Sequence, residues 1–485
     1  MDWDDTADVV VVGFGAAGVA SALTAARERA DVLVLERQPS SGHTPDAKAA
    51  AAFVMTVEDV ASGARYFERC AGGTTSAVVC EAWAGLAASL RDWLHEACPD
   101  LTSSAGQGMH GVAAHPELEG AGAVVTYQFA LPGSSGRPGA ELFEALAAAA
   151  RDTGRVRIAW GHRGRRLLRD VAGRVVGVQS TTADGRMHRV RARSGVVLTT
   201  GGFENDESLK RQYLRAAPMY FAGNPDNTGD GLRMAQAVGA DLWHMNGAEG
   251  RQVGRFALDD GHHLAFQMAI PPGGYVVVDG EGRRFCDEHR YTQIHTVWYE
   301  LFNYDPMTHT YPRIPAYWVF DEQRFTAAPL VSSMIGPVAL GLYEWSGDNS
   351  DELARGWIVT GSSANELGER LGLPRPDAVA ETVAEYNAGC ASGRDRFGRP
   401  PESLVALEPP FYAVPLYPGG VGTMGGPRHD EHGRVLDPFG APIPGLYAAG
   451  SVGQMIGELY PAPGSGWSEA LCAGRMAGLA AAGAS

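Results

Sequence analysis

The fold of this chain is decided near its N-terminus by the stretch Val12-Gly13-Phe14-Gly15-Ala16-Ala17-Gly18. Apolar, β-branched residues precede the turn over Ala7–Val12, and a helical pattern follows it over Val19–Arg29. A second apolar strand is indicated over Asp31–Leu35. A strand, a tight turn, a helix and another strand form a βαβ unit, and continuous apolar strands are typical of a parallel sheet covered on both faces. We therefore predict an α/β fold of the doubly wound type.

The glycines of this turn follow the spacing G-x-G-x-x-G between Gly13 and Gly18, and Glu36 ends the second strand. Glycines at this spacing let the backbone approach a pyrophosphate at a helix N-terminus, while the acid accepts hydrogen bonds from ribose hydroxyls. Glu36 followed by Arg37 favours an unphosphorylated ribose. The turn therefore predicts a site for FAD or NAD rather than for NADP.

The composition excludes several other classes of protein. The 485 residues are 45% hydrophobic and 20% charged, which is typical of a folded enzyme with two or three domains. A formal net charge of −16 argues against nucleic acid as a partner, because phosphate binding needs a basic surface. The acidic N-terminus and the lack of a long apolar run indicate neither signal peptide nor membrane span, so we expect a cytoplasmic protein. The six cysteines are far apart without metal-ligand spacing, so we expect free thiols and no metal site.

Further elements can be placed in the first half of the chain. Alanine-rich helices are indicated over Val79–Ala97 and Ala140–Ala150. A β-meander is indicated over Arg155–Val178, followed by a strand over Gly195–Thr199.

The character of the sequence changes after about residue 251. Aromatic and Pro-rich segments appear there, with a hairpin turn at Asp279-Gly280 and a helix over Pro376–Ala391. A strand over Leu446–Ala449 and a Gly/Ala-rich helix over Ser468–Ala482 return to the earlier pattern. We therefore predict a nucleotide-binding domain interrupted by an inserted α+β cap domain. The predicted boundaries are 1–251 and 422–485 for the first domain and 252–421 for the second.

Three later segments resemble the flavin motifs of one large superfamily. Gly195–Asn205, Asn227–Gly231 and Ile443–Gly450 resemble the second, third and C-terminal motifs of the fumarate reductase and succinate dehydrogenase flavoproteins. The resemblance implies a Rossmann-like, GR2-type domain with FAD as cofactor. It also implies that the final helix directs its N-terminus at the flavin pyrimidine edge, where its dipole favours the charge of reduced flavin. The residues expected to bind FAD are Gly13, Gly15, Ala16, Ala17, Gly18, Glu36, Arg37, Thr200, Gly201, Gly202, Asp230, Gly450, Ser451 and Ser468.

Positions that carry functional histidines and arginines in this superfamily differ here. Val421 and Gly422 stand where fumarate reductases have paired histidines, and Tyr460 lies near the place of an essential arginine. Two carboxylates need such positive partners, so succinate and fumarate are not the expected substrates. His43 stands where covalent members carry their flavin-linked histidine, which leaves covalent attachment open.

The segment Tyr460-Pro-Ala-Pro-Gly464 closely resembles the tyrosine–proline–x–proline–glycine motif of the 3-ketosteroid Δ1-dehydrogenases. In that family the tyrosine hydroxyl and the glycine N–H donate hydrogen bonds to the substrate ketone. The resemblance therefore implies that Tyr460 and Gly464 form an oxyanion site. Such donors suit the chemistry, because deprotonation beside a ketone places charge on the oxygen.

A second resemblance concerns the catalytic base. Gly282–Tyr291 resembles the block that precedes the catalytic tyrosine of ketosteroid dehydrogenases, which implies that Tyr291 removes the proton beside the ketone. Tyr291 has the spacing of the Δ4-(5α) branch of that family, whereas Tyr299 is placed more like a tyrosine of the Δ1 branch. Tyr127 is the candidate for the tyrosine that assists the base in Δ1 enzymes, although no motif surrounds it. The branch therefore stays open.

The predicted function is an FAD-dependent dehydrogenase that introduces a carbon–carbon double bond next to a ring ketone of a hydrophobic, 3-ketosteroid-type substrate. An external acceptor would take up the electrons. One alternative is a smaller alicyclic ketone such as an oxocyclohexane carboxylate, whose acid group Arg251, Arg255 or Arg290 could bind. Others are an enone or fumarate-type reductase working in reverse and a flavoprotein with purely structural FAD. The substrate size, the position of the double bond, the acceptor and the oligomeric state stay open.

Overall fold

A computed structural model describes residues 2–107, 110–269, 274–289 and 297–483, which divide into two compact units. Unit 1 contains Met1–Leu214, Gly223–Glu249 and Gly422–Ser485, and unit 2 contains Arg215–Ala222 and Gly250–Val421. The predicted first segment ran without interruption to residue 251, whereas Arg215–Ala222 belongs to unit 2. The reason is that Tyr220 and Phe221 form strand β10 beside Gly419 and Gly420 of unit 2.

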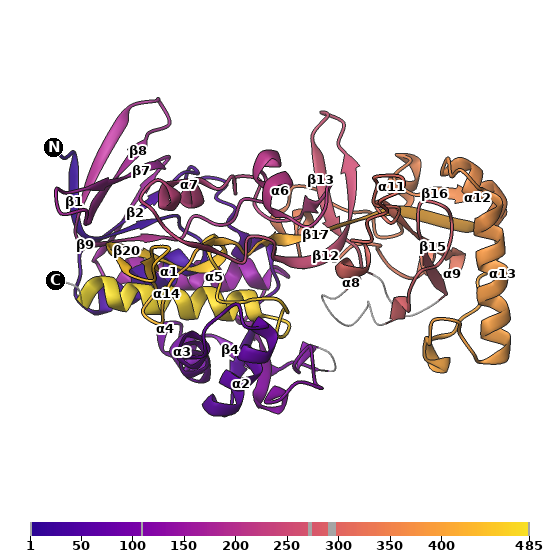
Figure 1. Cartoon of the computed structure of the whole chain (residues 1–485), viewed down its shortest axis with the longest axis horizontal. Coiled ribbons are helices and arrows are strands. Elements are labelled where there is room, and N and C mark those ends of the chain that lie inside the picture. Colours follow the sequence, from indigo (N-terminus) through magenta and orange to yellow (C-terminus); the bar gives the residue numbers. More distant parts are fainter. Residues whose placement is uncertain (1, 108–109, 270–273, 290–296, 484–485) are drawn as a thin grey trace. The chain divides into compact units, whose positions relative to one another are not determined.

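Unit 1 is built on an eight-stranded sheet with the path β19-β20-β9-β1-β2-β6 (Figure 1). Strands β20, β9, β1, β2 and β6 run parallel, while β19 and the β7-β8 hairpin are antiparallel additions. Because β1 lies in the middle with later strands on both sides, the sheet is doubly wound, as predicted. The strands are β1 (Asp5–Val12), β2 (Val32–Glu36), β6 (Val156–Trp160), β7 (Arg163–Arg169), β8 (Val175–Thr181), β9 (Met187–Leu198), β19 (Arg434–Leu436) and β20 (Pro442–Ala448).

Alternate residues of β1 point into two separate cores, as the continuous apolar pattern predicted. Val9 and Val11 pack with helices α1 (Ala16–Arg27), α5 (Pro138–Asp152) and α14 (Ser465–Gly483). Val10 and Val12 face the opposite cluster, which includes residues of the β7-β8 hairpin and of α7 (Asp230–Gln236). Both faces of the parallel strands are therefore covered.

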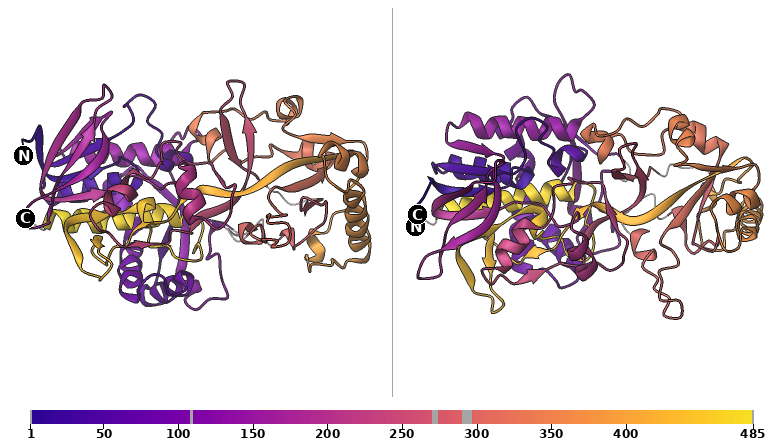
Figure 2. Two further views of the ribbon diagram at one scale, coloured as in Figure 1. Left: turned by 45° about the horizontal axis from the view of Figure 1, so that its top comes forward. Right: turned by 90° about the horizontal axis from the view of Figure 1, so that it is seen from above.

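Helices α1 and α14 pack closely and run in the same direction. A Cβ on Gly474 would lie 2.5 Å from the Ala17 oxygen, and a Cβ on Gly478 would lie 2.5 Å from the Ser21 oxygen. Gly474 thus lies against Ala17, and Gly478, one turn later, lies against Ser21, one turn later in α1. The two helices are therefore parallel. Because α1 begins where β1 ends, both helix N-termini lie at the edge where the parallel strands end. In all views α14, in yellow, ends on the side where β1 begins (Figure 2).

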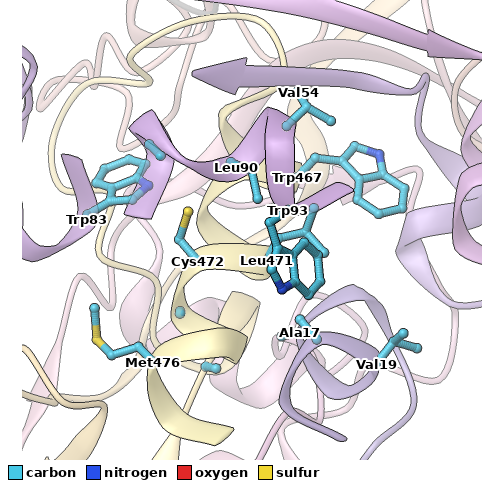
Figure 3. Packing of buried hydrophobic residues seen from close by; sticks show 14 of the residues in the cluster. Ala17, Val19, Val54, Trp83, Leu90, Trp93, Trp467, Leu471, Cys472 and Met476 are labelled. Atoms are coloured by element: carbon cyan, nitrogen blue, oxygen red, sulfur yellow. The ribbon is translucent and has the colours of Figure 1, made fainter. Parts of the chain in front are cut away.

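The side chains of α14 also fill the core beneath a small second sheet. Figure 3 shows Trp467, Leu471, Cys472 and Met476 among residues of α1, β3 and the helices α3 and α4. This sheet has the order β3-β5-β4. Its strands and the helices around it are β3 (Phe53–Val57), β4 (Thr102–Ala105), β5 (Val124–Ala130), α2 (Val60–Ala71), α3 (Ala77–Ala88) and α4 (Leu90–Ala97).

The helical stretch predicted over Val79–Ala97 consists of two helices, α3 and α4, which meet at Ser89. Ser89 has φ −94° and ψ 0°, and its hydroxyl donates to the Leu86 oxygen at 3.1 Å. A serine hydroxyl that bonds a nearby backbone carbonyl competes with regular helix geometry. The remaining short elements of unit 1 are α6 (Glu207–Tyr213), β11 (Leu242–Trp243) and β18 (Gly426–Pro427).

Unit 2 has a seven-stranded sheet with the path β13-β12-β17-β15-β14. The two remaining strands, β10 and β16, each pair with β17. The strands are β10 (Tyr220–Phe221), β12 (Ala248–Ala257), β13 (His263–Gln267), β14 (Tyr275–Val278), β15 (Ala316–Asp321), β16 (Val359–Gly361) and β17 (Phe411–Thr423). Its helices are α8 (Val297–Glu300), α9 (Glu322–Ala327), α10 (Pro337–Leu340), α11 (Ser350–Ala354), α12 (Ala364–Arg370) and α13 (Asp377–Ser392). Strand β10 pairs with β17 in parallel, whereas the pairs β12-β13, β14-β15, β15-β17 and β16-β17 are antiparallel. A mainly antiparallel sheet with separate helices is an α+β arrangement, so the predicted fold class is confirmed.

None of the described helices is both long and apolar enough to cross a membrane. Within the same described ranges, no group of three or more His, Cys, Asp or Glu side chains is arranged to hold a metal ion. The six cysteines are all free thiols.

Candidate active site

The three glycines of the N-terminal turn have different roles in the structure. Gly13 has φ +104°, and a Cβ there would lie 2.4 Å from the Thr199 oxygen. A Cβ on Gly18 would lie 2.2 Å from the Gly13 oxygen, so both positions need glycine for close packing. At Gly15, by contrast, the nearest atom to such a Cβ is the Cβ of Pro45 at 4.0 Å. The open space therefore lies over Gly15 at the N-terminus of α1, where a pyrophosphate would bind.

Residues after three parallel strands meet at this edge of the sheet. Thr199 follows β9 and donates its hydroxyl to the Gly13 oxygen at 2.8 Å. Gly450 follows β20 with φ +75°, and a Cβ there would lie 2.9 Å from the Ala17 Cβ. Ser451 accepts a hydrogen bond from Gln454 Nε2 at 3.2 Å. The predicted cofactor residues of the first and last segments therefore come together at the carboxyl ends of the strands.

Glu36 is held in a defined orientation next to the glycine turn. Its carboxylate accepts hydrogen bonds from the backbone N–H of Phe14 and of Gln38, both at 2.8 Å. Burial alone would raise the pKa of this carboxyl, but the nearby His43 imidazole and the hydrogen bonds from Gln38 and Phe14 hold the pKa below its usual value. An ionised acid at the end of the second strand is what binding of the adenosine ribose requires.

His43 lies against this acid, in a buried aromatic cluster. Its Nε2 is 3.7 Å from Glu36 Oε2, and its ring is 6.0 Å from that of Phe14, 5.6 Å from Phe143 and 5.1 Å from Trp160. Glu36 is expected to bind the adenosine ribose of FAD, so we expect the flavin ring at the other end of the site from His43.

We therefore expect FAD to be bound without a covalent link to His43. Acid precipitation of the protein should leave all flavin absorbance in the supernatant. His43→Leu should weaken FAD binding about tenfold, because a buried carboxylate loses a polar partner worth about 1–2 kcal/mol. His95→Leu, at a site where the imidazole contacts Ser103, is the matched control. Flavin that stays with the precipitate would contradict this expectation.

Arg37 and Asp230 form part of an ion-pair group. Arg163 binds both oxygens of Asp230, at 2.6 and 2.7 Å, and Arg37 lies 3.6 Å from Asp230 and 3.0 Å from Asp226. The Asp230 carboxylate, expected to contact FAD, is thus held by a bidentate arginine at the start of α7.

Two carboxyls that the sequence analysis missed, the buried Glu204 and the partly buried Asp46, are joined through Asn227 next to Gly201 and Gly202. Asn227 Nδ2 donates to Asp46 Oδ2 and to Glu204 Oε1, both at 2.6 Å. A Cβ on Gly201 would lie 2.3 Å from Asn227 Oδ1, so this network explains that glycine. Burial, followed by the charge of Asp46, raises the pKa of Glu204 to about 8. The two carboxyls therefore retain at least one proton near neutral pH.

The segment from Tyr460 to Gly464 leads directly into α14. The Tyr460 hydroxyl accepts a hydrogen bond from the Gly466 N–H at 2.7 Å. Gly464 has φ +82°, and a Cβ there would lie 2.6 Å from the carbonyl of Phe53. Within the described ranges, no hydrogen bond is found for the Gly464 N–H. The structure therefore brings both predicted ketone donors to one helix N-terminus.

Two side chains that the sequence analysis did not single out complete this end of α14. Glu249 Oε1 accepts a hydrogen bond from Gln454 Nε2 at 3.0 Å. A Cβ on Gly466 would lie 2.8 Å from Glu249 Oε1 and 3.1 Å from the Tyr460 oxygen. Glu249 comes 211 positions before Tyr460, and no motif marks it.

Several buried polar atoms near the two helix N-termini lack a hydrogen-bond partner among the described residues. They are Thr200 Oγ1, Gln454 Oε1, Ser468 Oγ and Glu469 Oε2. Buried polar atoms in proteins are normally paired, so such a group indicates a polar ligand. Together with the open space over Gly15, these atoms fit a bound FAD.

Glu469 predicts a measurable dependence of stability on pH. Burial raises the pKa of its carboxyl to about 8, from 4.5 in the unfolded chain. Between these values the folded protein binds more protons than the unfolded chain, so the free energy of unfolding falls as pH rises. Glu469→Gln cannot ionise. Its stability relative to the natural apoprotein should therefore rise by up to about 1.4 kcal/mol per pH unit between pH 5 and 8, measured by urea unfolding. A constant difference across this range would contradict the expectation.

The structure does not bring Tyr127 or Tyr299 to the Tyr460 segment within unit 1. Tyr127 belongs to unit 1 but faces away from that segment, and Tyr299 belongs to unit 2. On β5, Thr126 donates its hydroxyl to the Pro463 oxygen at 2.8 Å, whereas the Tyr127 ring lies 4.7 Å from the Arg91 guanidinium. Neighbouring strand residues point to opposite faces, so Thr126 faces the segment and Tyr127 does not. Tyr299 belongs to α8 of unit 2, where the Arg215 guanidinium lies 5.5 Å from its ring.

Tyr291 and Arg290 lie outside the described residues. The described residues of the motif Gly282–Tyr291 include an ion-pair network. Arg284 binds Glu288 at 2.6 and 2.7 Å and Asp395 at 2.6 Å, with Arg284 and Glu288 almost fully buried. Of the other two arginines considered for a carboxylate, Arg255 lies 4.6 Å from the ring of Tyr220. Arg251 lies on β12.

Comparison with known proteins identifies the family. A family model described as an FAD binding domain matches residues 8–467, so this chain belongs to that family and FAD is its cofactor. The predicted resemblance to flavoproteins of the ketosteroid dehydrogenase and fumarate reductase type is thereby confirmed.

Three curated relatives illustrate the range of similar proteins. The 3-oxosteroid 1-dehydrogenase of Mycolicibacterium smegmatis is 33% identical over 63% of this chain and 56% of that protein. The 4-oxocyclohexanecarboxylate 2-dehydrogenase of Sinomonas cyclohexanicum is 31% identical over 70% of this chain and 59% of that protein. Digoxin reductase of Eggerthella lenta is 27% identical over 96% and 85%. The chain thus spans little more than half the length of the first two.

Solved structures agree with the fold. The 3-ketosteroid Δ1-dehydrogenase of Sterolibacterium denitrificans, in complex with 1,4-androstadiene-3,17-dione, has a TM-score of 0.82 with 21% identity over 99% of this chain and 100% of that one. The 3-ketosteroid Δ4-(5α)-dehydrogenase of Rhodococcus jostii RHA1 has a TM-score of 0.70 with 25% identity over 99% and 98%. Both branches weighed from the sequence therefore share this fold.

Proposed function

We propose that this protein is an FAD-dependent dehydrogenase that introduces a carbon–carbon double bond beside a ring ketone of a hydrophobic, 3-ketosteroid-type substrate. The observation that carries the proposal is the position of the Tyr460 hydroxyl and the Gly464 N–H at the N-terminus of α14. Two donors at a helix N-terminus are suited to an oxygen that gains negative charge, as a ketone oxygen does when its neighbouring carbon loses a proton.

The hydrogen bond from Gly466 to Tyr460 contributes to this role. A hydroxyl that accepts a hydrogen bond through its oxygen becomes a stronger donor through its proton, because hydrogen bonds in a chain polarise one another. Tyr460 would then orient the ketone, and Gly464 would supply the second donor. FAD, when bound, supplies the acceptor for the hydride.

The base is assigned on sequence alone. Tyr291, which follows Glu288 in the ketosteroid dehydrogenase motif, would take the proton from the carbon beside the ketone.

A second candidate function is the reduction of an enone at the same site, with an external electron donor. This function is supported by the similarity to digoxin reductase, which extends over most of both chains. The same oxygen gains charge in both directions, so Tyr460 and Gly464 would serve either reaction.

Anaerobic mixing distinguishes these functions. The oxidised protein should lose its yellow colour on addition of 4-androstene-3,17-dione if it introduces the Δ1 bond, or of 5α-androstane-3,17-dione if it introduces the Δ4 bond, and an artificial electron acceptor should restore the colour. An enone reductase would instead keep its colour with both steroids, and its chemically reduced flavin would be reoxidised by an enone. A protein that responds to no ring ketone in either redox state would refute the proposal.

A further inference from the structure

The order of the parallel strands gives the direction in which FAD crosses unit 1. Strands β2, β1, β9 and β20 are neighbours in this order. Glu36, which is expected to bind the adenosine ribose, ends β2, and the turn with open space over Gly15 follows β1. After β20, Gly450 lies between the two helices, because its Cβ position is 2.9 Å from Ala17 Cβ and 3.9 Å from Ala470 Cβ. A dinucleotide that extends from Glu36 over Gly15 therefore places its flavin half beside the residues after β20 and the N-terminus of α14.

Gln454, four residues after Gly450, is buried at this end of the site and held through its main chain and its side chain. Its backbone N–H donates to the Met424 oxygen at 3.0 Å, and its backbone oxygen accepts a hydrogen bond from His244 Nδ1 at 2.8 Å. Its side-chain Nε2 donates to Glu249 Oε1 at 3.0 Å and to Ser451 Oγ at 3.2 Å. The carboxamide is therefore fixed in one orientation.

These contacts leave one polar atom of Gln454 without a partner. An amide nitrogen has two hydrogens, and both are accounted for by Glu249 and Ser451. Oε1 is buried and has no hydrogen-bond partner. A carboxamide oxygen can only accept a hydrogen bond, so the missing partner must be a donor. A phosphate or a carbonyl group of a ligand would not satisfy this atom, whereas an N–H or O–H group would.

We propose that Gln454 is a flavin-binding residue whose Oε1 accepts a hydrogen bond from the N3–H group of the FAD ring. In oxidised flavin this is the only N–H group of the ring, and the carbonyl groups on either side of it can only accept. An N–H group that is buried without an acceptor weakens binding. Gln454 supplies the acceptor at the place where the flavin half is expected. The inference concerns the cofactor and not the ketone, so it goes beyond the proposed function.

The experiment replaces the N3 hydrogen by a methyl group. The full-length protein is stripped of flavin, and its affinities for FAD and for 3-methyl-FAD are measured by titration of flavin fluorescence. We expect the natural protein to bind 3-methyl-FAD about thirtyfold more weakly than FAD, because the methyl group removes the donor and leaves Oε1 unpaired. In Gln454→Ala this ratio of dissociation constants should fall to within about threefold, because both the acceptor and the side chain that the methyl group would meet are gone.

The ratio separates a contact with N3–H from a purely structural role. Loss of the bonds to Glu249 and Ser451 in Gln454→Ala should weaken the binding of both flavins, but only loss of the acceptor for N3–H lowers the ratio between them. Gln212→Ala is the matched control, because Gln212 is exposed on α6 and its amide donates to Ser208 Oγ at 3.0 Å. This variant should keep the natural ratio.

Two results would overturn the inference. A ratio near one in the natural protein would show that N3–H has no buried acceptor. A ratio that stays at its natural value in Gln454→Ala would assign the donor to another group, such as a ribityl hydroxyl, which both flavins share. If Gln454→Ala does not fold, Gln454→Asn serves instead: it keeps the amide but is one methylene shorter, so its oxygen is drawn back and the ratio should again fall. No substrate is needed, so failure of the ring-ketone proposal would leave these ratios unaffected.

Discussion

Gly15→Trp is expected to give a folded, colourless protein that cannot be reconstituted with FAD. Gly15 has φ −89° and ψ −166°, a conformation open to any residue, and little protein lies near its Cβ position. An indole there would occupy the space over the N-terminus of α1 that the pyrophosphate needs. The measurement is flavin absorbance after incubation with FAD, with circular dichroism to verify the fold.

The structure supplies controls for this variant. Gly122→Trp adds the same side chain at an exposed glycine with no atom within 4 Å, and it should stay yellow. Gly13→Ala is unsuitable as a test of the cofactor site, because its Cβ would collide with the Thr199 backbone. This collision would lower the stability of the folded protein, whether or not FAD binds there. A yellow Gly15→Trp protein with natural affinity for FAD would place the pyrophosphate elsewhere.

Tyr460→Phe is expected to lower the rate of flavin reduction by a ring ketone about 10²- to 10³-fold, the usual effect of removing one oxyanion donor. The loss should be larger in the rate than in substrate binding, because the hydrogen bond strengthens as charge develops on the oxygen. The variant should keep its FAD. Rapid mixing under anaerobic conditions gives the rate, and titration with a phenolic ligand tests binding of an enolate-like oxygen.

Tyr447→Phe is the matched control for this change. Its hydroxyl donates a hydrogen bond to the Ala480 oxygen at 3.4 Å, and Tyr447 lies on β20. This variant should reduce its flavin at the natural rate. If Tyr460→Phe does so as well, the ketone donor lies elsewhere and the oxyanion site proposed at α14 is wrong.

The sequence was informative where function depends on residues that are close together in the chain. The strand, glycine turn and helix around Val12–Gly18 could be predicted because glycine spacing and apolar patterning are local properties, although α1 begins at Ala16 rather than at Val19. The same holds for the helix at the C-terminus and for the segment from Tyr460 to Gly464. The break at Ser89 was missed, because a helical pattern continues through it and only a side-chain hydrogen bond interrupts it.

The sequence alone thus determined the cofactor class, the doubly wound sheet and the helix that carries the proposed ketone donors. Only the tertiary structure decided that Glu249 stands beside Tyr460, that Asn227 joins Asp46 to Glu204, and that His43 lies against Glu36. The physical reason is that these contacts join segments up to about two hundred residues apart, brought together by the packing of parallel strands and helices. A single carboxylate without a motif has no local pattern, so its neighbours are set by the path of the chain.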